Sequence, residues 1–147
     1  MNTILKIAMA QIAPVWLDKN ATLQKIKNSI IEAAKENCEL VVFGEALLPG
    51  YPFWLALTGG AEWDKTVNKQ LHAHYVSNSI CIEKGELDAI CKLAKELSIA
   101  IYLGIIERPT DRGGHSIYAS LVYINEQGDV KSVHRKLQPT YDERLTW

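Results

Sequence analysis

The residue Glu45 stands where a parallel sheet commonly places a group that does chemistry. It follows the apolar run Leu40-Val41-Val42-Phe43, with only Gly44 between them. Four apolar residues in a row are typical of a parallel strand covered on both faces, and ligands bind beyond the carboxyl ends of such strands. A carboxylate there is poorly solvated, which favours its action as a general base. The alternative is a strand-end glutamate that simply turns to solvent.

Two further charged candidates lie near the end of the chain. In His134-Arg135-Lys136, strand geometry points His134 and Lys136 to one face and Arg135 to the other. The alternative for Lys136 is an edge strand protected by charge against aggregation. The other candidate is Glu143, for which a loop ion pair with Arg144, worth roughly 0 to 1 kcal/mol, is the alternative.

Aromatic residues and histidines give weaker signals. Tyr51 and Trp54 follow the Glu45 strand and are placed to line an apolar substrate pocket, although packing on a neighbouring element or subunit explains them equally well. His72 and His74 point about 200° apart on a helix, so they do not share a metal ion unless that segment is extended. No glycine-rich phosphate loop follows a strand, so nucleotide binding is unsupported.

The elements that must position these residues alternate between strands and helices. Apolar runs and periodicity predict strands over 4–12, 40–43 and 99–107, an antiparallel hairpin of 116–124 and 130–137, and helices over 20–37, 61–77 and 85–97. We expect Asn20 to cap the first helix. Strand, helix and strand at the start predict a right-handed βαβ unit, and the whole order indicates an α/β layered chain.

Composition excludes several classes of partner. The chain has 147 residues, 48% of them apolar and 22% charged, with a formal charge of −1. Such a balance provides no global field to attract nucleic acid or an anionic membrane, and no apolar stretch approaches a membrane span. With no secretory signal visible, we expect a cytoplasmic protein. Three cysteines, Cys38, Cys81 and Cys91, match neither a zinc site nor a disulfide framework and look structural.

Two motifs together resemble the nitrilase branch of the carbon-nitrogen hydrolase superfamily. They are Leu40-Val41-Val42-Phe43-Gly44-Glu45-Ala46 with Pro49-Gly50-Tyr51-Pro52, and His134-Arg135-Lys136-Leu137-Gln138-Pro139-Thr140-Tyr141-Asp142-Glu143-Arg144 with Trp147. The resemblance spans the chain and implies an α-β-β-α layered sandwich, of which residues 1–147 are the N-terminal part of a single domain. It also implies a Glu-Lys-Cys triad, with Glu45 and Lys136 in its first two positions and Glu143 as an additional active-site glutamate.

The sequence departs from the family pattern at two places. Gly44 stands where family members usually have proline, which should loosen the backbone beside Glu45. The nucleophilic cysteine of the family lies beyond the position of Trp147, and none of the three cysteines present matches its motif. We therefore expect this chain to supply the Glu and Lys of the triad but not the Cys, and to be inactive alone.

The resemblance implies a nitrilase that converts a nitrile to a carboxylic acid and ammonia through a covalent thioimidate and acyl-enzyme, without metal or organic cofactor. The aromatic loop 51–60 favours an aromatic or arylaliphatic nitrile. Family members assemble as dimers or spirals, so we expect a homo-oligomer. The alternatives are an amidase-type carbon-nitrogen hydrolase and a truncated, non-catalytic relative that acts as an oligomerisation module.

Overall fold

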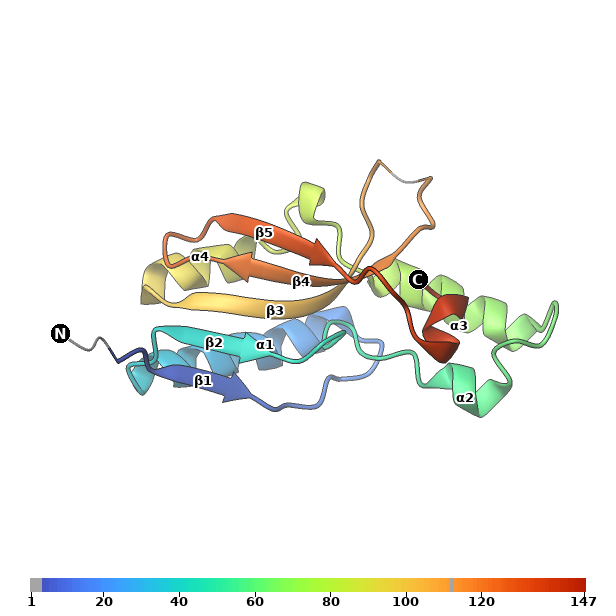
Figure 1. Cartoon of the computed structure of the whole chain (residues 1–147), viewed down its shortest axis with the longest axis horizontal. Coiled ribbons are helices and arrows are strands. Elements are labelled where there is room, and N and C mark those ends of the chain that lie inside the picture. Colours follow the sequence, from blue (N-terminus) through green and yellow to red (C-terminus); the bar gives the residue numbers. More distant parts are fainter. Residues whose placement is uncertain (1–3, 112) are drawn as a thin grey trace.

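A five-stranded mixed sheet organises the computed structural model, which describes residues 4–111 and 113–147 (Figure 1). In sheet order the strands are β1 (Ile7–Ala10), β2 (Leu40–Phe43), β3 (Ala100–Glu107), β4 (Tyr118–Ile124) and β5 (Val130–Arg135). The first three strands are parallel, whereas β4 and β5 are antiparallel to their neighbours. The predicted βαβ unit and the predicted hairpin are both confirmed.

Two helices cover one face of this sheet, α1 (Lys19–Lys35) and α4 (Asp88–Leu97). Ile26 and Ile30 of α1 and Ile90 of α4 pack against strand residues in the main core and are fully buried. Each such side chain contributes about 1.5 to 3 kcal/mol of burial free energy. None of the described helices is both long and apolar enough to cross a bilayer.

The cap of α1 differs from the prediction. Asp18, not Asn20, is the capping residue, and its Oδ1 accepts a hydrogen bond from the Ala21 amide at 2.9 Å. Asp18 has the extended backbone that an N-cap requires, whereas Asn20 already lies inside the first helical turn. The helix therefore starts one residue earlier than expected.

The second face of the sheet carries no helix in the part of the chain that the structure describes (Figure 1). We call it the open face. Met9 is 87% exposed there, and Ile7 and Leu121 are also exposed. The expectation that β2 is covered on both faces is thus wrong for these residues, since Val41 and Phe43 are buried while Leu40 and Val42 are only half-buried. The apolar run of β2 belongs to a sheet that is packed on one side.

A smaller core lies beyond the carboxyl ends of the parallel strands. It is built around α2 (Trp54–Thr58) and α3 (Thr66–Asn78), with Trp54 and Tyr75 buried at its centre, and the 3₁₀ helix η2 (Tyr141–Leu145) lies against α2. A further 3₁₀ turn, η1 (Ile82–Lys84), precedes α4. The sequence predicted neither α2 nor η2. The helix predicted over 61–77 begins later, and Trp63 lies outside it, 97% exposed.

Candidate active site

Glu45 lies just beyond the carboxyl end of β2, on the side of the open face. Its side chain is 56% exposed, so the prediction of a poorly solvated carboxylate is wrong for the described residues. The reason is the same as for the rest of the open face, which no described element covers. The carboxylate does not turn away into solvent, however, because Oε1 lies 3.0 Å from the Lys136 ammonium.

The backbone around Glu45 is held closely against β3. A Cβ on Gly104 of β3 would lie 2.1 Å from the Gly44 carbonyl oxygen and 2.8 Å from the Glu45 Cα. Only glycine permits such an approach. The Leu48 amide then donates to the Gly104 carbonyl at 3.3 Å, and the Ile106 amide donates to the Leu48 carbonyl at 2.8 Å. The segment after β2 is therefore fastened to β3, although a Cβ built on Gly44 would meet nothing within 4 Å.

Lys136 comes directly after β5, and its backbone amide donates to the Ala119 carbonyl of β4 at 2.8 Å. Its ammonium lies between two carboxylates, at 3.0 Å from Glu45 Oε1 and at 2.9 and 3.1 Å from the two oxygens of Glu143. His134 lines the same cavity as Lys136, whereas Arg135 contacts Glu107 instead. The predicted alternation of side chains is confirmed. Lys136 is more than a solvated charge that protects an edge strand, because its ammonium contacts two carboxylates.

Glu143 is buried, with 4% of its side chain exposed. It belongs to a capping box at the start of η2, in which Oε2 accepts from the Thr140 amide at 2.6 Å and from the Thr140 hydroxyl at 2.9 Å. The alternative pair with Arg144 is not formed, since Arg144 Nε donates to the Pro139 carbonyl. Glu143 is thus oriented by Thr140 while it contacts Lys136.

The contacts around the Lys136 ammonium shift the pKa values of Lys136 and Glu143. The hydrogen bond to Glu143, and then contact with Glu45, raise the pKa of Lys136 above its ordinary value, although burial opposes this. Burial acts to raise the pKa of Glu143, but the Thr140 amide, the Lys136 ammonium and the Thr140 hydroxyl outweigh it and hold that pKa below its ordinary value. Lys136 therefore stays a cation and Glu143 an anion around neutral pH.

An apolar cavity of about 590 Å³ opens beside these charges. It is lined by Val42, Phe43, Glu45, Gly104, Ala119, Ser120, Leu121, His134, Lys136 and Leu137. Tyr51 lines a second, smaller hollow of about 240 Å³ that also includes Glu45. Trp54 does not line either one. It is 1% exposed and packs edge-on against Tyr75, because α2 turns its side chain into the smaller core.

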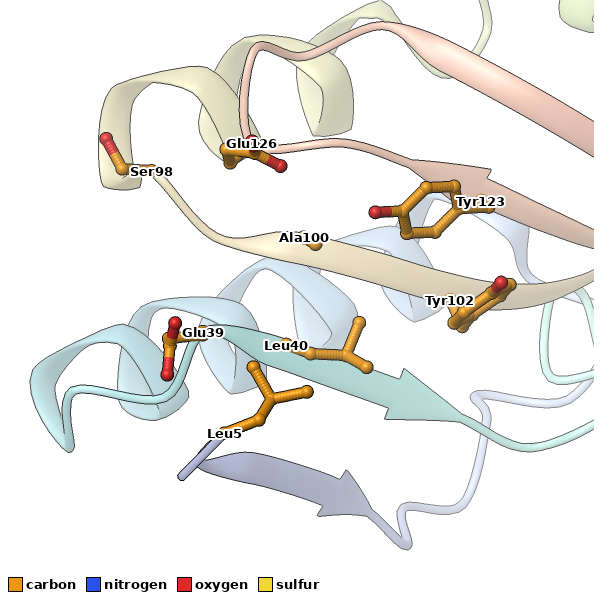
Figure 2. A pocket seen from close by; sticks show the side chains of 8 residues that line it. All are labelled: Leu5, Glu39, Leu40, Ser98, Ala100, Tyr102, Tyr123 and Glu126. Atoms are coloured by element: carbon orange, nitrogen blue, oxygen red, sulfur yellow. The ribbon is translucent and has the colours of Figure 1, made fainter. Parts of the chain in front are cut away.

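A separate cavity of about 560 Å³ lies at the opposite end of the open face (Figure 2). Tyr102 and Tyr123, on neighbouring strands β3 and β4, stand side by side there with ring centroids 4.7 Å apart. The other lining residues are Leu5, Glu39, Leu40, Ser98, Ala100 and Glu126. No cation lines this cavity, so it does not share the charge arrangement around Lys136.

The described residues contain no group of three His, Cys, Asp or Glu side chains that is able to hold a metal ion. His74 Nε2 lies 3.1 Å from the Leu17 carbonyl, which is a structural contact. None of the three cysteines lines the cavity beside Lys136 or the hollow beside Glu45, and burial raises the thiol pKa of Cys81 and of Cys91. A raised pKa disfavours the thiolate, so neither thiol is prepared as a nucleophile.

Comparison with known proteins identifies the family of the chain. The carbon-nitrogen hydrolase family matches residues 6–147. The chain belongs to the carbon-nitrogen hydrolase family. Among similar curated proteins are a nitrilase 2 from an unknown prokaryotic organism, 37% identical over 142 residues, and an arylacetonitrilase from Hypocrea virens, 36% identical over 144 residues. The matches cover 96% and 98% of this chain but only 43% and 40% of those relatives.

Solved structures show the same fold at low sequence identity. An amidase from Nesterenkonia sp. superposes with a TM-score of 0.68 at 16% identity, covering 97% of this chain and 47% of that one. The C. elegans NitFhit protein gives a TM-score of 0.65 at 18% identity, covering 93% of this chain and 30% of that one. These likenesses confirm the predicted α/β fold of the carbon-nitrogen hydrolases.

Two residues that shape the site escaped the sequence predictions. Gly104 reads as one apolar residue within a strand, and only its contact with Gly44 shows why glycine is required. Thr140 is different, because Thr140-Tyr141-Asp142-Glu143 has the Ser/Thr-x-x-Glu pattern of a capping box. The capping-box pattern is the local signal from which η2 and the orientation of Glu143 could have been predicted.

Proposed function

We propose that this chain supplies the general base and the cation of a nitrilase that converts a nitrile and two waters to a carboxylic acid and ammonia. The observation that carries the proposal is the position of Lys136, whose ammonium bridges Glu45 and Glu143 at the mouth of an apolar cavity. A carboxylate and a fixed cation are the two groups that thiol addition to a nitrile requires besides the thiol.

The reaction needs a nucleophile that the described residues do not provide. Relatives named nitrilase and arylacetonitrilase are more than twice as long as the matched region, since the chain spans 43% and 40% of their lengths. We infer that a cysteine in the remaining part of the domain completes the triad. The complete protein, meaning the product of the full reading frame that contains these 147 residues, is then the catalytic species.

In this mechanism Glu45 takes the thiol proton and the thiolate attacks the nitrile carbon. The carbon–nitrogen triple bond becomes a double bond, and Glu45 returns the proton to the nitrogen, which gives a neutral thioimidate and restores the Glu45 carboxylate. Lys136 stabilises the negative charge that develops on nitrogen, and the raised pKa of Lys136 keeps it a cation while it does so. A first water, activated by Glu45, adds to the thioimidate carbon, and ammonia leaves to form a thioester. A second water releases the acid and returns the thiol.

The surroundings of Glu45 favour a nitrile with an aromatic or arylaliphatic group. The cavity beside Lys136 is lined mainly by apolar side chains, and the Tyr51 ring borders the hollow next to Glu45. Seven of the curated relatives similar to this chain are named arylacetonitrilase. Amide hydrolysis is the second candidate reaction, because the solved structures with this fold include an amidase.

The test is to read the coding sequence beyond the Trp147 codon and assay the complete protein on matched panels of nitriles and amides. We expect ammonia release from arylacetonitriles, and we expect Glu45→Gln to reduce kcat by at least about 10³-fold because the general base is lost. Glu32→Gln, at an exposed position on α1, is the matched control and should keep wild-type turnover. Turnover of amides but not nitriles would favour the amidase, and an immediate stop codon would favour a non-catalytic relative.

We also propose that the complete protein is a homo-oligomer. Trp63 and Leu57, near the loop between α2 and α3, are 97% and 81% exposed, and large apolar side chains at that exposure commonly mark interfaces. Light scattering should give a mass of at least two protomers. A single-protomer mass at micromolar concentration contradicts this proposal and leaves the catalytic one unaffected.

A further inference from the structure

A second buried carboxylate, Glu107, lies on the opposite face of the sheet from Glu45 and Lys136. Glu107, the last residue of β3, is 3% exposed. Arg135 binds it with two parallel hydrogen bonds, from Nε to Oε2 at 2.8 Å and from Nη2 to Oε1 at 2.7 Å. The Ser120 hydroxyl donates to the same Oε2 at 2.7 Å. Such bidentate pairing determines orientation as well as charge.

The side chains of this cluster come from three neighbouring strands of the sheet and connect them through hydrogen bonds. Glu107 belongs to β3, Ser120 to β4 and Arg135 to β5, and Ser120 is the register partner of Arg135. The Arg135 guanidinium also lies over the Tyr118 ring at 4.6 Å from its centroid. The four side chains of β5 from Lys131 to His134 are exposed. Among the described residues, the contacts of Arg135 with Glu107 and Tyr118 therefore hold the end of this edge strand to the sheet.

Lys136 is the residue immediately after this anchor. Because alternate residues point to opposite faces, Arg135 reaches Glu107 on one side while Lys136 reaches Glu45 and Glu143 on the other. The Lys136 amide bond to Ala119 extends the ladder by one residue before the chain leaves the sheet. Movement of Arg135 would therefore displace the backbone of Lys136 and, with it, the position of the Lys136 ammonium.

We propose that Arg135, Glu107 and Ser120 are positioning residues that set the place of Lys136 between Glu45 and Glu143. This inference rests on the proposed function, in which Lys136 stabilises developing charge. A buried ion pair contributes little net stability compared with apolar residues of the same size, because desolvation opposes it. The rate of reaction depends much more strongly on where a catalytic group lies, since a displacement of about 1 Å can cost about 10²-fold in rate.

The experiment compares Arg135→Lys and Ser120→Ala with the wild type in the complete protein. Arg135→Lys keeps the charge but loses the bidentate fork, and Ser120→Ala removes one hydrogen bond from Glu107. We expect kcat to fall about 10-fold to 100-fold in Arg135→Lys and less in Ser120→Ala, with KM within about twofold of wild type. Lys131→Met, on the same strand but with its ammonium paired to Asp129 instead of the Glu107 cluster, is the control and should keep kcat.

A pH profile separates positioning from simple stabilisation. Contact with the two carboxylates raises the pKa of Lys136, so a displaced ammonium would lose its proton at lower pH. The alkaline loss of kcat should accordingly move to lower pH in Arg135→Lys, whereas a purely structural pair would change the melting temperature alone. Folded Arg135→Lys protein with wild-type kcat and an unchanged alkaline limb overturns the proposal.

Crystal structures of the same variants make the result independent of activity. The distance from Lys136 Nζ to Glu45 Oε1 should increase from 3.0 Å by about 1 Å or more in Arg135→Lys. An unchanged distance counts against the positioning role. If the wild-type complete protein hydrolyses neither nitriles nor amides, the proposed function fails, and this distance still decides whether Arg135 positions Lys136.

Discussion

A single ammonium shared by two carboxylates makes Lys136 the electrostatic centre of the site. Its two partners are not equivalent, because Glu143 is buried and held by Thr140 whereas Glu45 is half in solvent. Glu143 therefore holds the cation from the protein interior, whereas the Glu45 carboxylate is accessible from solvent. The two glutamates thus differ in burial and in hydrogen bonding, as the different roles proposed for them require.

Glu143→Gln should lower the free energy of unfolding by about 1 to 3 kcal/mol at pH 7, because it weakens a buried, charge-assisted contact. The pKa of Glu143 is lowered in the folded state, so its stabilisation is present above its ordinary value of 4.5 and is lost as pH falls through the lower folded value. Urea unfolding between pH 7 and pH 3 measures this. The difference between wild type and variant should shrink below about pH 4.5, and a constant difference would contradict the assignment.

Among the elements, the contact between β3 and the segment after β2 decides where Glu45 sits. Gly104→Ala would place a methyl group against the Gly44 carbonyl and the Glu45 Cα. We expect a loss of about 1 to 3 kcal/mol in stability from this overpacking, together with a lower kcat in the complete protein. Thermal unfolding and steady-state kinetics measure the two effects.

Gly44→Ala is the matched control for that substitution. Nothing lies within 4 Å of a Cβ built at Gly44, and the alanine reduces the freedom of the unfolded chain. We expect unchanged or slightly raised stability and unchanged kcat. Equal losses in the two variants would show that glycine flexibility, not close approach, matters at Gly104.

The elements also show what the sequence was able to predict. Runs such as Leu40–Phe43 and the periodicity of α4 carry their own signal, so β2 and α4 were found within a few residues of their observed bounds. Glu45, Lys136 and Glu143 were found by motif, and the structure brings all three together. Trp54 was misplaced because a five-residue helix has too little periodicity to reveal which side it buries. The contacts of Gly104 and Glu107 depend on strand register, which no local pattern contains.

The whole molecule presents an apolar sheet face that its own described helices leave open. We expect the C-terminal part of the complete protein to cover this face, as the layered sandwich of the family implies. Met9→Lys should then cost about 3 kcal/mol or more in the complete protein, where the charge would be buried, and within about 0.5 kcal/mol in the 147-residue chain, where Met9 is exposed. Denaturant unfolding of both lengths measures the difference. Equal effects in the two proteins would mean that this face stays uncovered.

The order of the strands has a consequence for how the molecule folds. Among the described residues, strand β5 pairs with β4 alone, and β4 is joined to the parallel strands through β3. Lys136 follows β5 and Glu45 follows β2, so their contact spans most of the chain and carries a large loop-closure entropy. The parallel βαβ unit and the hairpin can form from nearby residues, but this contact must wait until they have joined. We therefore expect the contact between Glu45 and Lys136 to form late in folding and to break early in unfolding.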